Sequence, residues 1–428
     1  MTNEVSDADI QLVLDGFKNI FSGAISPEQF SIAAMKNFME PIFEQAGYRK
    51  PSNGTINNIL LMHEAAVGDF IAISPVIREV RRAYPNAHIT LIVEKGSANL
   101  AEFCPYIDEL ISSEFLSAYH SFALTWFTNL NIASNLLRRR FDVALAFAYS
   151  KTPNVPLLAY MSGARERVSQ NSDSMWKKLL TTLIVPKDLK ANVVDIMILF
   201  AEFLIKKRVS NRELEAWVDD ADVESVRVLL PTSRRLYALC VGGTRPKKHY
   251  PPESYAQMMN MIAQEDDALT FVLIGGKTDV EEAARIRKLV EPNRVIDLAG
   301  KLTFRQTTAA LSFCELYIGN DTAPMHLAAA VGIPILSPNC FPRDLKVQSN
   351  VVNYWHPYGV PSVIVCPSHA LPECADSTNF YGCQAEEPHC ITQITPQHLF
   401  DAYKVLLKRI DEGINQPLLF DTEKGEFA

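Results

Sequence analysis

The sequence predicts an α/β protein with two parallel β-sheets, each flanked by helices. Short apolar segments alternate with helical ones over residues 56–215, and a second alternating series runs over residues 236–407. Residues 219–233 between the two series are charged and weakly patterned, which is typical of a linker. Alternation of this kind favours parallel strands joined by crossover helices. At 428 residues, the chain is long enough for two domains, each with its own core.

The first 50 residues are predicted to be helical and to lie outside both α/β units. Apolar residues recur at helical spacing in two runs, from Ile10 to Phe17 and from Phe30 to Ile42. The Pro-Ser-Asn-Gly cluster that follows marks a boundary. Packing on the core and packing on a neighbouring subunit both stay open for this extension. The predicted division of the chain is 1–50, 51–218, a linker at 219–234, and 235–428.

In the first series, Asp69 is the candidate functional side chain. The apolar strand at residues 59–62 leads into a short turn that contains Gly68 and Asp69, and then into an amphipathic helix. Open parallel sheets bind ligands at the carboxyl ends of their strands, where this carboxylate would lie. The commoner role of Asp at such a position is to cap the helix, and that alternative stays open.

In the second series, the segment at residues 319–330 is the most informative part of the chain. The strand at residues 316–318 runs into a polar turn and then into a helix rich in small residues. Asp321 or Thr322 can cap this helix, and Pro324 suits its first turn. A helix start with free N–H groups and a positive dipole end is a ready anion site. An ordinary core helix after a buried strand is the alternative.

Composition excludes some classes of partner. The chain has 48% hydrophobic residues, 21% charged residues and a net charge of −8, which describes a soluble globular protein and argues against nucleic acid. No apolar run reaches the length of a membrane span, and the acidic N-terminus lacks a signal pattern, so we expect a cytoplasmic protein. Basic clusters occur at 138–140, 177–178 and 206–208. We expect solvated faces there, or, if the clusters converge, a surface for an anionic acceptor or for the inner membrane face.

Five ordered blocks resemble glycosyltransferase family 9, the ADP-heptose–dependent heptosyltransferases. They are Val-Gly-Asp at 67–69 with Ser-Pro-Val-Ile-Arg at 74–78, Phe-Asp-Val-Ala-Leu at 141–145, Arg-Pro-Lys-Lys-His-Tyr-Pro-Pro-Glu at 245–253, Leu-Ala-Gly-Lys at 298–301, and Gly-Asn-Asp-Thr-Ala-Pro-Met-His-Leu at 319–327. The resemblance spans residues 58–407. It implies a GT-B fold, in which two Rossmann-like domains with parallel sheets face a cleft.

The resemblance also implies a role for each matching residue. Asp69 matches the catalytic base, in the half of the molecule that binds the acceptor. The residues matching the donor site, for the phosphates and the sugar, are Lys247, Lys248, Asp321, Thr322, Ala323, Met325 and His326. Ala323 stands where the family usually has glycine, so its backbone contact needs an alanine-compatible conformation. No cofactor is expected at the transfer centre.

Four of the eight cysteines fall in one Pro- and Gly-broken loop at residues 366–390. They are Cys366, Cys374, Cys383 and Cys390. Because C-x-x-C pairs are absent, the spacing favours no zinc ribbon. Relatives in the resembled family often carry such a loop, and some that act on proteins bind iron there. A structural iron or zinc site and ordinary thiols both stay open.

The resulting hypothesis is an inverting glycosyltransferase that moves heptose from ADP-heptose to a hydroxyl of a lipopolysaccharide core sugar. The expected partners are an ADP-sugar donor and a glycan or glycolipid acceptor, and a homo-oligomer is left open. One alternative acceptor is a Ser or Thr of an autotransporter-type protein. Another alternative is a nucleotide-sugar epimerase or binding protein of the same architecture. A nicotinamide dehydrogenase is disfavoured because neither first strand is followed by G-x-G-x-x-G.

Overall fold

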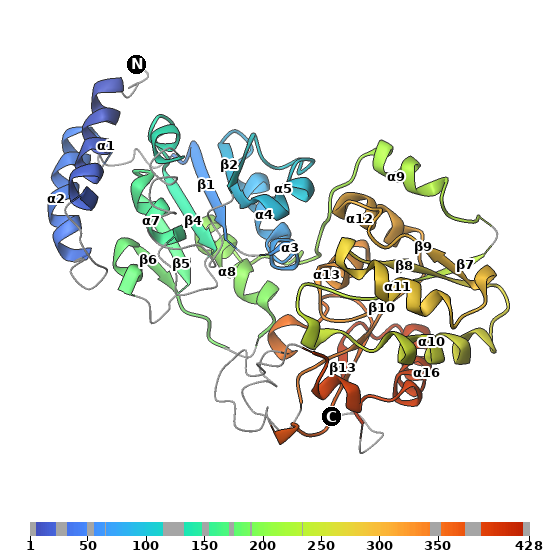
Figure 1. The fold of residues 1–428 in the computed structure, drawn as a ribbon. Coiled ribbons are helices and arrows are strands. Elements are labelled where there is room, and N and C mark those ends of the chain that lie inside the picture. Colours follow the sequence, from blue (N-terminus) through green and yellow to red (C-terminus); the bar gives the residue numbers. More distant parts are fainter. Residues whose placement is uncertain are drawn as a thin grey trace. The chain divides into compact units, whose positions relative to one another are not determined.

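The computed structural model describes residues 6–22, 32–48, 55–64, 66–113, 132–147, 154–170, 175–188, 191–232, 234–342, 352–372 and 387–422. The chain forms two compact units (Figure 1). The N-terminal unit comprises Met1–Phe70, Val76–Lys187 and Met197–Ser210. The C-terminal unit comprises Ile71–Pro75, Asp188–Ile196 and Asn211–Ala428.

The N-terminal unit contains a six-stranded parallel sheet in the order β3-β2-β1-β4-β5-β6. Its strands are β1 (Asn58–His63), β2 (His88–Glu94), β3 (Glu109–Ser113), β4 (Val143–Phe147), β5 (Glu166–Gln170) and β6 (Thr182–Ile184). The central strands β1 and β4 are almost entirely buried. Burial on both faces explains why these strands are continuous apolar runs rather than alternating ones. The helices of this part of the chain are α3 (Val67–Ile71), α4 (Ser74–Ala83), α5 (Lys95–Ala101), α7 (Asn154–Met161) and α8 (Val193–Ile205), with the 3-10 helix η1 (Met175–Leu179).

The predicted helical extension consists of α1 (Asp7–Ser22) and α2 (Ile32–Gln45), which lie side by side (Figure 1). Phe17 of α1 and Phe43 of α2 are fully buried against Tyr160 of α7. The ring centroids of Phe43 and Tyr160 are 5.4 Å apart in an edge-to-face arrangement. The extension therefore shares a hydrophobic cluster with the N-terminal unit, and the first of the two alternatives for its packing is the one observed.

The C-terminal unit contains a seven-stranded parallel sheet in the order β13-β12-β11-β10-β7-β8-β9. Its strands are β7 (Arg235–Cys240), β8 (Leu269–Ile274), β9 (Val295–Asp297), β10 (Leu316–Gly319), β11 (Ile335–Pro338), β12 (Ser362–Cys366) and β13 (Pro417–Asp421). Among the described residues, its α-helices are α9 (Asp220–Arg227), α10 (Pro252–Ala263), α11 (Val280–Arg287), α12 (Phe304–Ser312), α13 (Ala323–Val331) and α16 (Pro396–Asp411). Its 3-10 helices there are η2 (Pro246–Lys248), η3 (Lys277–Asp279), η4 (Pro292–Arg294) and η5 (Cys390–Gln393). The prediction of two parallel α/β sheets is confirmed.

Part of the predicted linker is helical. Residue Asp219 begins α9 with a capping box, in which its side chain accepts a hydrogen bond from the backbone N–H of Asp222. An ion pair of 2.8 Å joins Asp222 to Arg305 of α12. The charged pattern of this segment therefore reflects caps and an ion pair. Among the described residues, no helix is long and apolar enough to span a membrane.

Candidate functional site

The strand orders locate where each sheet can bind a ligand. In both sheets the order reverses once, between β1 and β4 and between β7 and β10. In open α/β sheets, ligands bind at the carboxyl ends of the strands at such a switch point. Asp69 follows β1, Asp321 follows β10, and Lys248 follows β7 along the chain. The predicted polar residues thus lie after the strands that flank the two switch points.

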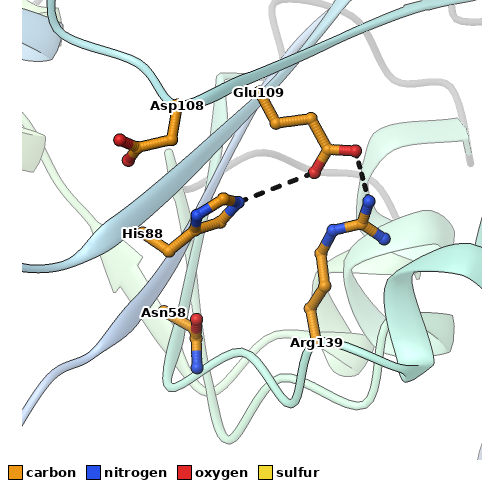
Figure 2. Close-up of a pocket in the computed structure, with 5 residues that line it drawn as sticks. All are labelled: Asn58, His88, Asp108, Glu109 and Arg139. Carbon is orange, nitrogen blue, oxygen red and sulfur yellow. Dashed lines mark hydrogen bonds and ion pairs between the residues drawn. The ribbon is translucent and has the colours of Figure 1, made fainter.

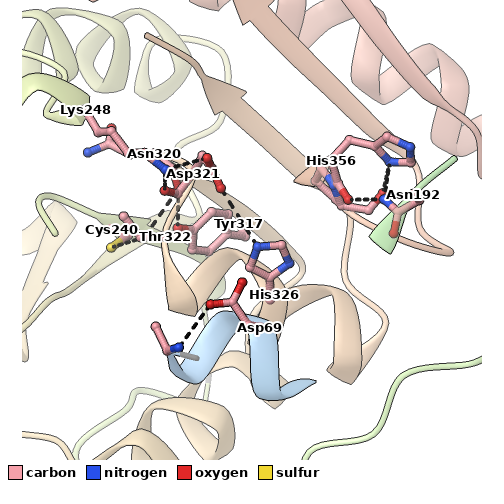
Figure 3. Close-up of polar contacts among 12 residues, drawn as sticks. Asp69, Asn192, Cys240, Lys248, Tyr317, Asn320, Asp321, Thr322, His326 and His356 are labelled. Carbon is pink, nitrogen blue, oxygen red and sulfur yellow. Dashed lines mark hydrogen bonds and ion pairs between the residues drawn. The ribbon is translucent and has the colours of Figure 1, made fainter. Parts of the chain in front are cut away.

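In the C-terminal unit, Lys248 and Asp321 form an ion pair (Figure 3). The ammonium of Lys248 donates to Oδ2 of Asp321 at 2.6 Å and to its backbone carbonyl at 3.0 Å. The side chains of Lys248 and Asp321 are 17% and 10% exposed. Burial alone would raise the pKa of the Asp321 carboxyl, but the charge of Lys248 and its hydrogen bond outweigh burial and lower it. Burial opposes the charged form of Lys248 as well, and Asp321 outweighs it and raises the pKa of the ammonium. Both groups are therefore charged at neutral pH.

His326 lies beside the same carboxylate. Its Nε2 is 3.9 Å from Oδ1 of Asp321, the oxygen that faces away from Lys248. Burial lowers the pKa of His326 to about 4, so the imidazole is neutral at physiological pH. The ring of Trp355 stands edge-on to His326, with centroids 6.2 Å apart. Three of the predicted donor-site residues, Lys248, Asp321 and His326, thus converge around one carboxylate.

The start of α13 differs in one respect from the expectation. Thr322 is the N-cap residue, and Pro324 lies in the first turn as predicted. Within the described residues the Thr322 side chain makes no capping hydrogen bond, and the Asp321 carboxylate binds Lys248 instead. Ala323 is the first helical residue, which is a conformation that alanine adopts readily. The N–H of Met325 donates to the Thr322 carbonyl at 3.0 Å.

Asp69 lies in the N-terminal unit, in the short helix α3, and is half-buried. Its Oδ2 accepts a hydrogen bond from the backbone N–H of Ala66 at 3.0 Å. The capping role that the sequence left open is therefore present in the structure. One carboxylate oxygen serves that contact. The preceding strand ends at the buried His63, whose ring packs edge-on against Phe70. Burial lowers the pKa of His63 to about 3.

A model of glycosyltransferase family 9 (heptosyltransferase) matches residues 130–337. The chain is 23% identical over 307 residues to lipopolysaccharide heptosyltransferase 3 of Escherichia coli, which covers 67% of this chain and 86% of that protein. It is 21% identical over 290 residues to the lipopolysaccharide core heptosyltransferase OpsX of Haemophilus influenzae, covering 68% and 80% of the two chains. The family model covers just under half of the chain, and these comparisons support the predicted resemblance to glycosyltransferase family 9.

Two solved structures of the family have the same fold as this glycosyltransferase. The E. coli ADP-heptose lps heptosyltransferase II aligns with a TM-score of 0.62 at 19% identity, over 83% of this chain and 99% of that one. The family 9 glycosyl transferase of Veillonella parvula aligns with a TM-score of 0.67 at 19% identity, over 84% and 100%. The predicted GT-B fold with two Rossmann-like α/β units is confirmed.

The other predicted residues of this glycosyltransferase divide into two groups. Lys247 shares the turn η2 with Lys248, but Lys248 is the lysine that contacts Asp321. Cys366 and Cys390 are buried, whereas Cys374 and Cys383 lie outside the described residues. Within the described ranges, no group of three or more His, Cys, Asp or Glu side chains is arranged to hold a metal ion. The iron or zinc site stays a prediction.

Two of the basic clusters of the glycosyltransferase are engaged in local contacts. Arg138 pairs with Asp7 at 2.5 Å, Arg139 pairs with Glu109, and Arg140 lies over the ring of Tyr48. In the other cluster, Lys206 lies over the Phe203 ring at 3.9 Å and Arg208 pairs with Glu202 at 3.0 Å. These contacts account for both clusters as local structural charges.

An open pocket of about 590 Å³ lies at the amino ends of β1, β2 and β3 (Figure 2). It is lined by Asn58, His88, Asp108, Glu109 and Arg139. Glu109 is bonded to Arg139 and lies 3.8 Å from His88, while Asp108 is bonded to Arg81. Ligands of parallel sheets bind at the opposite, carboxyl edge. The side chains that line the pocket therefore form an ion-pair network that holds neighbouring strands together, and we assign the pocket no role in transfer.

Proposed function

We propose that this glycosyltransferase transfers a heptose from ADP-heptose to a sugar hydroxyl of a lipopolysaccharide core, with inversion at the anomeric carbon. The observation that carries the proposal is the Lys248–Asp321 ion pair at the start of α13, on the switch point of the C-terminal sheet. The names of the relatives supply the sugar, the nucleotide and the acceptor class.

The donor half of the proposal rests on the hydrogen bonds that the Lys248 ammonium donates. An ammonium has three donors, and two of those of Lys248 go to Asp321. The third is left for a diphosphate oxygen, which would also meet the positive end of the α13 dipole. Oδ1 of Asp321, on the side of His326, would accept a hydrogen bond from a sugar hydroxyl. Lysine and the helix start would stabilise the leaving diphosphate, so the proposed transfer uses no metal.

The acceptor half rests on Asp69. Its carboxylate takes the proton of the acceptor hydroxyl, and that oxygen forms a bond to the anomeric carbon. The bond between the anomeric carbon and the diphosphate oxygen breaks, its electron pair stays on ADP, and Asp69 ends protonated.

Asp69→Asn tests the base separately from the cap. Asparagine keeps an oxygen that can accept from the Ala66 N–H, but it cannot take a proton at neutral pH. We expect unchanged thermal stability and donor binding, with turnover reduced by a factor on the order of 10²–10⁴. Asp69→Ala serves as the comparison, since it loses both the cap and the base. Turnover near the wild-type rate in Asp69→Asn would reject the assignment.

The acceptor class requires its own experiment. Purified enzyme is incubated with labelled ADP-heptose and either heptose-deficient core oligosaccharide or a candidate autotransporter protein. Label on the oligosaccharide supports the proposal, and label on Ser or Thr of the protein supports the alternative acceptor. Conversion of the donor in the absence of any acceptor would favour an epimerase.

A further inference from the structure

Asn320, which directly precedes Asp321, is fully buried and has a polar network of its own. Its side-chain oxygen accepts from the hydroxyl of Tyr255 in α10 at 2.8 Å and from the backbone N–H of Tyr250 at 3.4 Å. Its side-chain nitrogen donates to the carbonyl of Gly242, after β7, at 3.5 Å. One amide thus contacts three residues that precede it by 65, 70 and 78 positions in the sequence, and Figure 3 shows it beside Asp321.

The network connects the two chain segments that carry the ion pair. Tyr250 is two residues beyond Lys248, and Asn320 is one residue before Asp321. The Tyr250 end is itself fixed, because its hydroxyl donates to the carbonyl of Ile394 at 2.9 Å and its ring packs edge-on against Tyr255 at 4.8 Å. A shift of either segment that changed the Lys248–Asp321 distance would therefore also disturb the contacts of the buried amide.

The chemistry of the network calls for an amide. Asn320 uses an acceptor oxygen toward two donors and a donor nitrogen toward a carbonyl, and the side-chain amide of Asn or Gln carries these two groups on separate atoms. Aspartate would place a charge in a site with 0% exposure, and an apolar side chain would leave the Tyr255 hydroxyl without this partner. Buried polar groups that lose their partners are costly, so the network has one favoured arrangement.

We propose that Asn320 is a positioning residue for the donor site: it sets the placement of Lys248 relative to Asp321 without touching the donor. The inference rests on the proposed function, since the diphosphate and the sugar are the groups those two residues would bind. Because Asn320 is fully buried, its side chain would otherwise be counted as part of the core. The inference gives this side chain a role in donor affinity.

Tyr255→Phe and Asn320→Leu test the inference, with Tyr403→Phe as the matched control. The control variant Tyr403→Phe also loses a buried hydrogen bond of a tyrosine hydroxyl. In the wild type, the Tyr403 hydroxyl lies 3.2 Å from the Tyr237 hydroxyl, in the same unit but away from Asp321. The probes are ADP and ADP-heptose in calorimetric titrations, with steady-state KM values for donor and acceptor. We expect Tyr255→Phe to weaken donor binding about 5- to 20-fold and Asn320→Leu to weaken it more. The KM of the acceptor and all constants of Tyr403→Phe should stay within about twofold of wild type.

Equal losses in Tyr255→Phe and Tyr403→Phe would show a general stability effect and overturn the inference, as would unchanged donor affinity in Asn320→Leu. A second readout needs no donor. A crystal structure of Asn320→Leu should show the Lys248 Nζ displaced from the 2.6 Å contact with the Asp321 carboxylate. If the Lys248–Asp321 contact is unchanged in that structure, the inference is contradicted, even if the enzyme uses another nucleotide sugar. If the contact is lost but wild-type enzyme does not bind ADP-heptose, the result counts only against the proposed donor.

Discussion

Removing the ammonium of Lys248 should destabilise the C-terminal unit as well as weaken donor binding. In Lys248→Met the apolar stem is kept and the charge is lost, so the Asp321 carboxylate stays 10% exposed without its cation. Breaking a buried ion pair at one end costs about 3–5 kcal/mol, and the remaining exposure of both side chains favours the low end, about 3 kcal/mol. For a unit of this size, that corresponds to a drop in Tm of about 6–12 °C.

The double variant Lys248→Met/Asp321→Asn distinguishes this account from a general packing defect. With the charge at residue 321 also removed, no unpaired ion is buried, and most of the lost stability should return. Donor affinity should not return, since both donor-binding groups are gone. Differential scanning calorimetry of the wild type, the two single variants and the double variant gives the coupling energy between Lys248 and Asp321.

The pH dependence of the same variants follows from the signs of the pKa shifts. Folding lowers the pKa of Asp321 from 3.8, so its contribution is present above 3.8 and is lost as the pH falls through the folded value. Folding raises the pKa of Lys248 from 10.5, so its contribution is present below 10.5 and is lost as the pH rises through the folded value. In Lys248→Met, burial raises the pKa of Asp321, and acid neutralises it. The cost of Lys248→Met should therefore shrink as the pH is lowered from 7. Full wild-type stability of Lys248→Met at pH 7, or a double variant no more stable than Lys248→Met, would refute the reasoning.

Two further predictions concern buried groups of the two units. Folding lowers the pKa of His326 from 6.5 to about 4. The free energy of unfolding of the wild type should therefore fall by up to about 3 kcal/mol as the pH drops from 6.5 to about 4, measured in thermal melts. The substitution His326→Gln should partly flatten this pH dependence. A melt that is flat over this range in wild type would contradict the buried, neutral state of His326. Phe43→Ala should destabilise the N-terminal unit by about 3–5 kcal/mol, seen as faster hydrogen exchange in α1 and α7. Phe38→Ala on the same helix is the control: its side chain is 48% exposed, and it should cost less than about 0.5 kcal/mol. Equal effects of the two substitutions would argue against packing of the extension on its unit.

The parts of the fold that the sequence predicted well are those with a local signal. Apolar runs identified the strands β1 and β10, and helical periodicity identified α1 and α2. Helix α9 within the predicted linker was not expected, because its charges serve a capping box on Asp219 and an ion pair to Arg305. Composition does not distinguish these two contacts from solvation. Helix α9 is short and has no strong apolar face, so periodicity gave no signal for it.

The donor-site residues were predicted by type, but their contacts depend on strand order. Lys248 and Asp321 are 73 residues apart and meet because β7 and β10 are neighbours in the sheet. No sequence pattern specifies that adjacency. The same limit explains why Asn320 was seen only as part of a motif. Its partners Tyr250 and Tyr255 come from the neighbouring segment, and the direction of its side chain follows from the packed sheet.

The charge balance of the site constrains how a diphosphate can bind there. Lys248 is already matched by Asp321, so the pair presents little net charge to an incoming anion. Attraction must then come from groups beyond the pair. Arg245 lies three residues before Lys248 in the sequence and is a candidate for this attraction, and the start of α13 adds a positive dipole. In the proposed donor site, Asp321 would hold the ammonium in a fixed direction and leave one of its hydrogens to the phosphate. Because a preformed pair loses little side-chain freedom when the donor arrives, Asp321 would contribute orientation, and Arg245 with the helix start would contribute the attraction.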